Sequence, residues 1–99
     1  MYRIVYTKKA AADIPNLKSA KLAKKAMALV DLIRESPFRT PPPYEKLVGD
    51  MQGAYSRRIN IKHRLVYEVI PNTDNKKDGN GTPFDGTVKI ISLWSHYER

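Results

Sequence analysis

A run of three prolines, Pro41–Pro43, separates two halves of the chain that have different hydrophobic patterns. Proline fixes its own backbone and keeps the preceding residue out of the helical region. Ser36-Pro37 is therefore expected to end a helix, and Pro41–Pro43 to form a stiff, extended connector. The residues before the connector have helical spacing, whereas those after it are rich in aromatic and β-branched side chains. This order indicates helices that pack against a later set of strands.

The half before the prolines predicts one strand and two helices. Residues 1–7 are rich in β-branched and aromatic side chains, which is typical of a short strand. Thr7 is suited to cap a helix over residues 8–18, which contains Pro15. A second helix, with Ser19 as its cap, follows because apolar side chains recur every three or four residues between basic ones. The apolar positions are Leu22, Ala26, Leu29, Val30 and Ile33.

The half after the prolines predicts strands. Residues 54–59 and 65–70 are separated by the polar residues 60–63, which favours an antiparallel hairpin. Residues 88–94 predict a third strand of the same sheet. Between the last two strands, residues 72–86 are rich in Asn, Gly and charged side chains, which indicates a long, flexible loop.

Together these elements predict an α+β fold. We expect an N-terminal strand and two helices packed on one face of a mostly antiparallel sheet of about four strands. Residues 1–99 are expected to form a single domain, with 72–86 as a flexible loop insertion, because a chain of this length buries enough surface for one core. The other face of the sheet would then be available for a ligand.

The composition excludes several classes of site and points to an anionic partner. There is no cysteine and there are only two histidines, so disulfides, thiol nucleophiles and cysteine-ligated metals are excluded, and no metal or other cofactor is expected. No glycine-rich phosphate loop, serine-hydrolase motif or zinc-protease motif occurs. We expect neither a signal peptide nor a membrane span. The net charge of +8 favours nucleic acid, an acidic protein or a membrane surface as partner.

A small polar set carries the remaining chemistry. A carboxylate or imidazole can take a proton from a 2′-hydroxyl, an arginine can stabilise charge on phosphorus, and a second imidazole or a tyrosine can protonate a leaving oxygen. Such a set can cut RNA without a metal, but the residues alone equally allow a basic domain that only binds RNA. Adjacent Arg57 and Arg58 face opposite sides of a strand, and His63 at a hairpin turn favours a surface hydrogen-bonding role. The set comprises Glu45, Arg57, Arg58, His63, Arg64, His96 and Tyr97.

Four short motifs resemble the YoeB (Txe) branch of the RelE/ParE toxin superfamily. They are Tyr44-Glu-Lys-Leu47, Gly53-Ala-Tyr-Ser-Arg-Arg-Ile59, His63-Arg-Leu-Val-Tyr67 and Trp94-Ser-His-Tyr97. The spacing of the two central motifs is the most specific part of the resemblance, which covers most of the chain. It implies the α+β fold described above and a bacterial, cytoplasmic toxin of a type II toxin–antitoxin system.

The resemblance also implies roles for individual residues. Glu45 matches the general base of the family, Arg64 its phosphate-stabilising arginine and His96 its general acid. The remaining matches are expected to bind RNA, with Arg58 as a second site arginine, Tyr97 as the aromatic residue beside the acid, and two contacts to backbone phosphates. Those two contacts are Arg57 and Lys46.

The implied activity is cleavage of mRNA in the ribosomal A site, on the 30S subunit, by attack of a 2′-oxygen on the adjacent phosphate. The implied partners are the ribosome, mRNA, a second copy of the chain and an acidic antitoxin of the YefM/Phd type that folds on binding. The sequence departs from the branch in two places. The segment 72–86 is longer than expected, and Ser95 stands where related chains can carry a basic residue.

The sequence alone also allows two other functions. One is a ParE-like inhibitor that poisons DNA gyrase by binding, which would not require Glu45 and His96 together. The other is a basic RNA-binding domain without catalysis, which would show steep salt dependence of binding.

Overall fold

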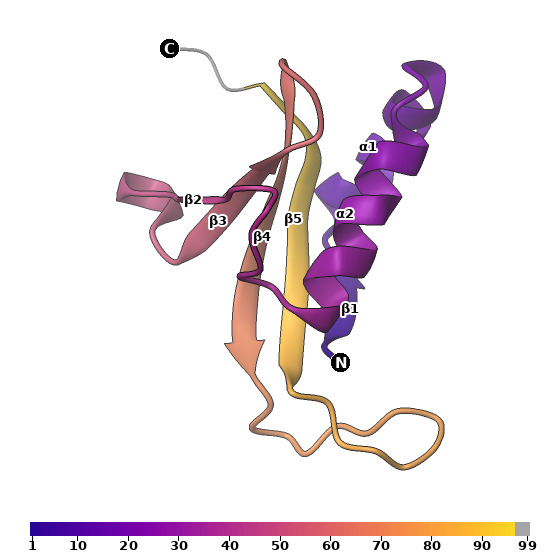
Figure 1. Ribbon diagram of the computed structural model, residues 1–99, viewed down its shortest axis with the longest axis vertical. Helices are drawn as coiled ribbons and strands as arrows, with labels where there is room; N and C mark the ends of the chain where they lie inside the picture. The colour runs from indigo at the N-terminus through magenta and orange to yellow at the C-terminus, as the bar shows by residue number, and fades with distance from the viewer. Residues whose placement is uncertain (97–99) are drawn as a thin grey trace.

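A computed structural model describes the backbone of residues 1–96 and the side chains of residues 1–94. In chain order the elements are β1 (Arg3–Tyr6), α1 (Lys8–Ser19), α2 (Ala23–Glu35), β2 (Glu45–Lys46), the short 3-10 helix η1 (Gly49–Met51), β3 (Ala54–Arg58), β4 (His63–Pro71) and β5 (Gly86–His96). One sheet has the strand order β1-β5-β4-β3-β2, in which β1 pairs parallel to β5 and all other pairs are antiparallel (Figure 1). The predicted α+β class, with two helices, is confirmed.

The two helices begin and end largely where local chemistry requires. Thr7 caps α1 as predicted, because its Oγ1 accepts a hydrogen bond from the N–H of Ala10 at 3.0 Å. Pro15 lies within α1. The prediction that Ser19 caps the second helix is wrong. Ser19 is the last residue of α1, and a turn through Lys21, whose φ is +60°, separates the helices, so that α2 begins only after Leu22.

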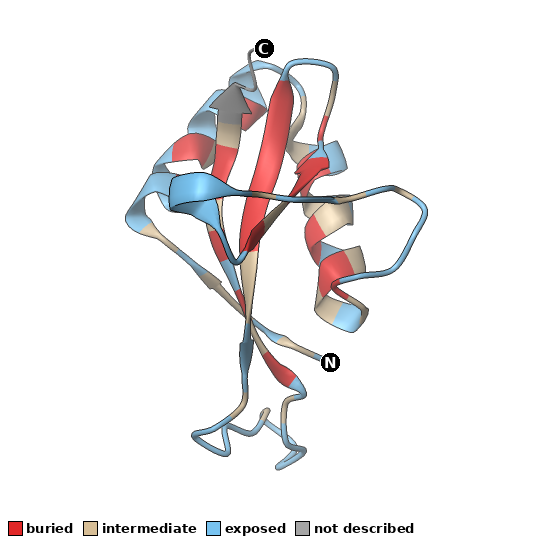
Figure 2. Cartoon of the chain, turned by 90° about the vertical axis from the view of Figure 1, so that its left-hand side faces the viewer, coloured by how far each residue is buried: buried red, intermediate tan, exposed pale blue. Residues whose placement is uncertain are grey.

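The core lies between the helices and one face of the sheet. Leu17 of α1 and Ile33 of α2 are fully buried against Leu65 and Tyr67 of β4 and Ile90 of β5. The buried stretches of β4 and β5 run through the middle of the molecule, with the helices along one side (Figures 1 and 2). Within residues 1–96, no helix has the length and apolar character needed to cross a membrane.

The sheet has one strand more than predicted. Strand β2 has only two residues, Glu45 and Lys46, and it pairs with β3 at the sheet edge. The segment before it is also not the extended connector that the proline run predicted. The carbonyl groups of Pro37, Arg39 and Pro42 converge on one side chain, so the segment curves over the sheet.

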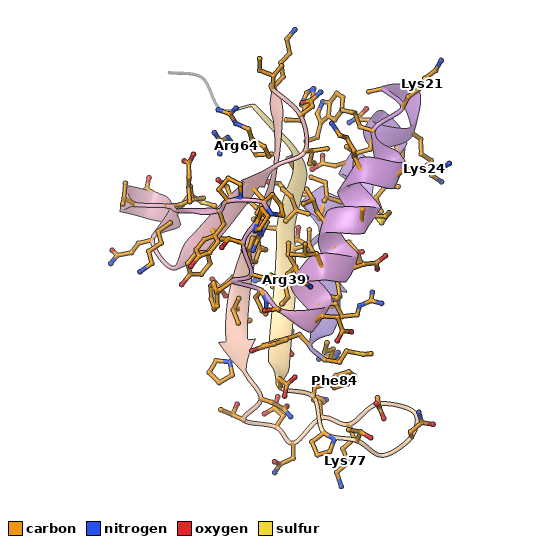
Figure 3. The ribbon with its side chains drawn as sticks, viewed as in Figure 1. Lys21, Lys24, Arg39, Arg64, Lys77 and Phe84 are labelled. Carbon is orange, nitrogen blue, oxygen red and sulfur yellow. The ribbon has the colours of Figure 1, made fainter. Side chains whose placement is uncertain are left out.

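The segment predicted as a flexible loop extends the β4–β5 hairpin. The Asn72 side chain hydrogen-bonds to the backbone of Lys76 and Phe84, and the Asp78 side chain accepts from two backbone N–H groups across the tip. Figure 3 shows Lys77 and Phe84 at one end of the molecule and Arg64 at the other. The hairpin tip therefore takes no part in the site described next, and its flexibility stays a prediction.

Candidate active site

A cleft of about 290 Å³ opens on the sheet face away from the core. Strand pairing explains why its polar residues share one face. Residues that are directly opposite in an antiparallel pair point to the same side, and Glu45 lies opposite Ser56 while Arg58 lies opposite Arg64. Ser56 and Arg58 are two positions apart on β3, so all four belong to one face. The cleft is lined by Pro42, Pro43, Glu45, Ser56, Arg58 and Arg64.

Arg64 lies at the centre of this cleft. Its Nη1 is 3.3 Å from Glu45 Oε1 and donates a hydrogen bond to Ser56 Oγ at 3.2 Å. The Arg64 side chain is only 9% exposed, whereas the Glu45 side chain is 54% exposed. The guanidinium is therefore held between two partners, while the carboxylate remains open to a molecule that enters the cleft. Sequence reasoning missed Ser56, although its position two residues before Arg58 on the same strand was the available signal.

Arg57 does not lie at the cleft. It is opposite Leu65 on the core face and is 0% exposed. Its guanidinium donates to the carbonyls of Pro37, Arg39 and Pro42 and, through Nε, to the hydroxyl of Tyr67. The predicted contact with an RNA phosphate does not fit this position, because burial and these four acceptors give the side chain a structural role. Arg57 instead holds the proline-rich segment that leads directly into Glu45.

Aromatic rings complete this anchor. Phe38 and Tyr44 of the proline-rich segment lie edge-on against Tyr55 of β3, with ring centroids 4.9 Å and 5.8 Å from it. The Arg57 guanidinium carbon lies 5.3 Å from the centroid of the Tyr44 ring, within the range of a cation–π contact. One wall of the cleft is therefore fixed from the opposite face of the sheet.

Tyr67 makes the anchor sensitive to alkaline pH. Its hydroxyl donates to the Pro37 carbonyl at 2.7 Å, and burial raises the pKa of the phenol above its usual value. A group whose pKa is raised by folding contributes stability that is present below its unfolded pKa and is lost as pH rises through its folded pKa. The stability of the protein should therefore fall above about pH 10.

Tyr67→Phe should lower the free energy of unfolding at pH 7 by about 1–3 kcal/mol, because Pro37 and Arg57 each lose a buried partner. The variant should also lose less stability than the wild type between pH 9 and pH 11. Urea unfolding across this pH range measures both effects, with Tyr2→Phe, just before β1, as the control. An equal alkaline loss in wild type and Tyr67→Phe would contradict the prediction.

The other predicted residues have different positions. Lys46 lies opposite Tyr55 and so on the other face of β2, where it lines a separate hollow of about 480 Å³. His63 is not at a turn surface, because it is the first residue of β4, is buried and stacks on Trp94 with ring centroids 3.7 Å apart. The side chain of His96 and all of Tyr97 lie outside the described residues. In the backbone, His96 pairs with His63, next to the pair that Arg64 forms.

No cluster of three or more His, Cys, Asp or Glu side chains in the described part of the chain has the spacing to hold a metal ion. The cleft instead combines one carboxylate with two guanidinium groups. Such a set suits a ligand with a phosphodiester, because the arginines bind the charged oxygens and the carboxylate accepts a proton.

Comparison with known proteins gives this cleft a context. Residues 6–97 match the model of a family described as the YoeB-like toxin of bacterial type II toxin-antitoxin systems. The chain belongs to this family. It is 34% identical to Toxin YoeB of Synechocystis sp. over 79 residues, which cover 80% of this chain and 76% of that protein.

Solved structures of YoeB proteins share the fold. A YoeB/ParE toxin from Agrobacterium tumefaciens superimposes with a TM-score of 0.73 at 28% identity, covering 96% of this chain and 99% of that one. A YoeB-YefM complex from Staphylococcus aureus superimposes with a TM-score of 0.68 at 30% identity, covering 98% and 99%. The protein is therefore a YoeB-like toxin, and the family match spans every residue of the cleft.

Proposed function

We propose that this YoeB-like toxin is a ribosome-dependent endoribonuclease that cleaves mRNA in the A site. The observation that carries the proposal is the cleft in which Arg64 is buried against Glu45 and Ser56, with Arg58 at its rim. An accessible carboxylate beside a fixed guanidinium can accept the proton of a 2′-hydroxyl while the adjacent phosphate is bound. Membership of a toxin family supports this reading over a domain that only binds RNA.

In the proposed reaction, Glu45 takes the proton from the 2′-hydroxyl, and the 2′-oxygen forms a bond to the adjacent phosphorus. The bond from phosphorus to the 5′-oxygen breaks, and His96 supplies the proton that this oxygen needs. Arg64 stabilises the extra negative charge on the phosphorus centre, and Arg58 binds a neighbouring oxygen. The products are a 2′,3′-cyclic phosphate and a free 5′-hydroxyl. Tyr97 would contact the RNA near this centre, and Lys46, on the other face of β2, would contact the RNA backbone farther along the chain.

The proposal extends to partners and organisation. The Staphylococcus aureus relative occurs in a YoeB-YefM complex and as a YoeB dimer. We infer an acidic antitoxin of the YefM/Phd type for this chain, because a net charge of +8 favours an acidic, partly disordered partner. Residues 1–99 would act as one toxin domain that works in the cytoplasm, as a monomer or a homodimer.

Purified protein added to ribosomes stalled on a defined mRNA tests the proposal. Primer extension should map cuts to the A-site codon. The same mRNA without ribosomes should be cut far more slowly, because the ribosome supplies the orientation of the 2′-oxygen. The upstream product should carry a cyclic phosphate that acid opens.

The contrary outcomes separate the other functions. Uncut mRNA together with double-strand DNA breaks in a gyrase assay would replace the proposal with gyrase poisoning. Uncut mRNA with salt-dependent RNA binding would leave a binding domain without catalysis. Equal cleavage of free and ribosome-bound mRNA would retain the nuclease but overturn its dependence on the ribosome.

A further inference from the structure

Strand β5 does not keep one register along β4. From residue 86 to residue 90 the pairing with β4 is regular, and two shifts then follow, one between Tyr67 and Val66 and one between Val66 and Arg64. Each shift places one additional residue in β5, so β5 contains two β-bulges just before its end. Arg64 consequently pairs with Ser95.

These bulges determine which residue of β5 pairs with the cleft arginine in the backbone. In the register of the first half of the pair, Leu93 would lie opposite Arg64, and His96 would lie beyond the end of β4, in the turn. With both bulges, Ser95 pairs with Arg64 and His96 pairs with His63. The two additional residues therefore bring the backbone of His96 alongside the arginine of the cleft.

Helix α1 binds the backbone groups that the bulges turn out of the ladder. Thr7, its cap, donates through Oγ1 to the carbonyl of Ile91 at 2.7 Å. Asp13 accepts through one oxygen, Oδ2, from the N–H groups of both Leu93 and Trp94, at 2.9 Å and 3.1 Å. Successive N–H groups on a strand ordinarily point in opposite directions, so their convergence on one oxygen is specific to the bulge.

Asp13 is an unusual residue for its position. It shares the buried stripe of α1 with Ala10 and Leu17, and it is only 4% exposed. Lys9 donates to both oxygens of Asp13, at 2.7 Å and 2.8 Å, so the buried carboxylate is paired with a cation. Burying a carboxylate is costly unless it is paired and hydrogen-bonded, and an apolar side chain would suffice for packing alone. The carboxylate, unlike an apolar side chain, fixes the backbone of β5 at Leu93 and Trp94 through two hydrogen bonds.

We propose that Asp13 is a positioning residue for the cleavage reaction, acting through the β5 bulge that sets the backbone register of the strand end that carries His96. The inference rests on the proposed function, in which His96 is the general acid. The helix and the cleft lie on opposite faces of the sheet, so Asp13 acts through the strand and does not touch the substrate. Its replacement should disturb the end of β5 while leaving Glu45 and Arg64 in place.

The structural half of the proposal has its own test. In Asp13→Ala, amide hydrogen exchange at Leu93 and Trp94 should accelerate at least tenfold relative to the rest of β5. The fluorescence of Trp94, the single tryptophan, should change because its ring stacks on His63. Asp13→Asn keeps an accepting oxygen without the charge, so its exchange rate at Leu93 and Trp94 should lie between those of the wild type and Asp13→Ala. Asp31→Ala, on the exposed face of α2, is the matched control and should match the wild type.

The functional half is measured as cleavage on programmed ribosomes. Asp13→Ala should lower kcat by roughly tenfold to 100-fold with KM nearly unchanged, because the misplaced group acts in the chemical step and not in binding. In a His96→Gln background the same change should cause no further loss. The effects of substitutions at two groups that act as one unit do not add, whereas general damage to the fold would lower the rate again.

Each outcome decides between named alternatives. Should Asp13→Ala fail to fold, Asp13→Asn carries the same comparison. Unchanged kcat in the folded variants, with a cleaving wild type, would overturn the role of Asp13 alone, as would an additive loss in the His96→Gln background. A wild type that cuts no mRNA under any condition would overturn the proposed function and this role with it. Slow exchange at Leu93 and Trp94 in Asp13→Ala would show that the bulge does not depend on the carboxylate.

Discussion

Arg64→Ala is expected to lower the single-turnover rate of A-site cleavage by roughly 10³-fold, the effect of removing a preorganised group from a developing charge. The guanidinium is buried and fixed by Glu45 and Ser56, so it needs no rearrangement when the phosphorus centre gains charge. Loss of growth arrest on expression in cells should accompany the loss of rate. The free energy of unfolding should also fall, by about 1–3 kcal/mol, because the buried side chain is removed and the buried Ser56 Oγ loses its donor, so the rates are compared on protein shown to be folded.

Two further variants make this result specific. Arg64→Lys keeps the charge without the planar pair of donors and should recover only part of the rate. Arg34→Ala removes an arginine that pairs with Asp31 on the surface of α2, and it should cleave like the wild type. Cleavage by Arg64→Ala within about threefold of the wild-type rate, far below the 10²–10³-fold cost of losing a preorganised donor, would remove Arg64 from the mechanism.

The elements that the sequence predicts well are those with a local cause. Helix α2 follows from the recurrence of Leu22, Ala26 and Ile33, and the β3–β4 hairpin from two β-rich runs around a polar turn. Strand β2 has no such signal. Its two residues are both charged, and only pairing with β3 makes them a strand.

The sequence predicted which residue types form the candidate site, but not which face of the sheet or which register places them. Alternation along β3 shows that Arg57 and Arg58 face opposite sides, but the choice of side depends on the core, which forms around Leu65. The register of β5 could not be predicted either, because the two polar residues of the run from Val88 to Trp94, Lys89 and Ser92, are three positions apart and so break the alternation of a regular strand. Asp13 was the missed signal, since it is a carboxylate on the apolar stripe of an alanine-rich helix.

Burial of Arg57 exemplifies a cation that stabilises the fold without a carboxylate in contact. Its hydrogen-bond partners among the described residues are three carbonyls and one phenol, and it lies between the proline-rich segment and the sheet. The Pro37 carbonyl also accepts from Tyr67, whereas those of Arg39 and Pro42 have Arg57 as their side-chain donor, and a buried acceptor left without a donor costs about 1–3 kcal/mol. The side chain therefore replaces the backbone hydrogen bonds that a proline-rich segment cannot make for itself.

Arg57→Ala should lower the free energy of unfolding by more than about 3 kcal/mol, since three carbonyls and the Tyr67 hydroxyl each lose a hydrogen bond and a large buried volume is emptied. That is a large part of the 5–15 kcal/mol typical of such a domain, so the urea midpoint should fall steeply. Arg57→Lys should recover little, because one ammonium cannot reach acceptors spread around a planar guanidinium. Arg58→Ala, the neighbouring exposed arginine, should unfold like the wild type. Equal midpoints for the Arg57 and Arg58 variants would contradict the anchoring role and leave the position of Glu45 to β2 pairing alone.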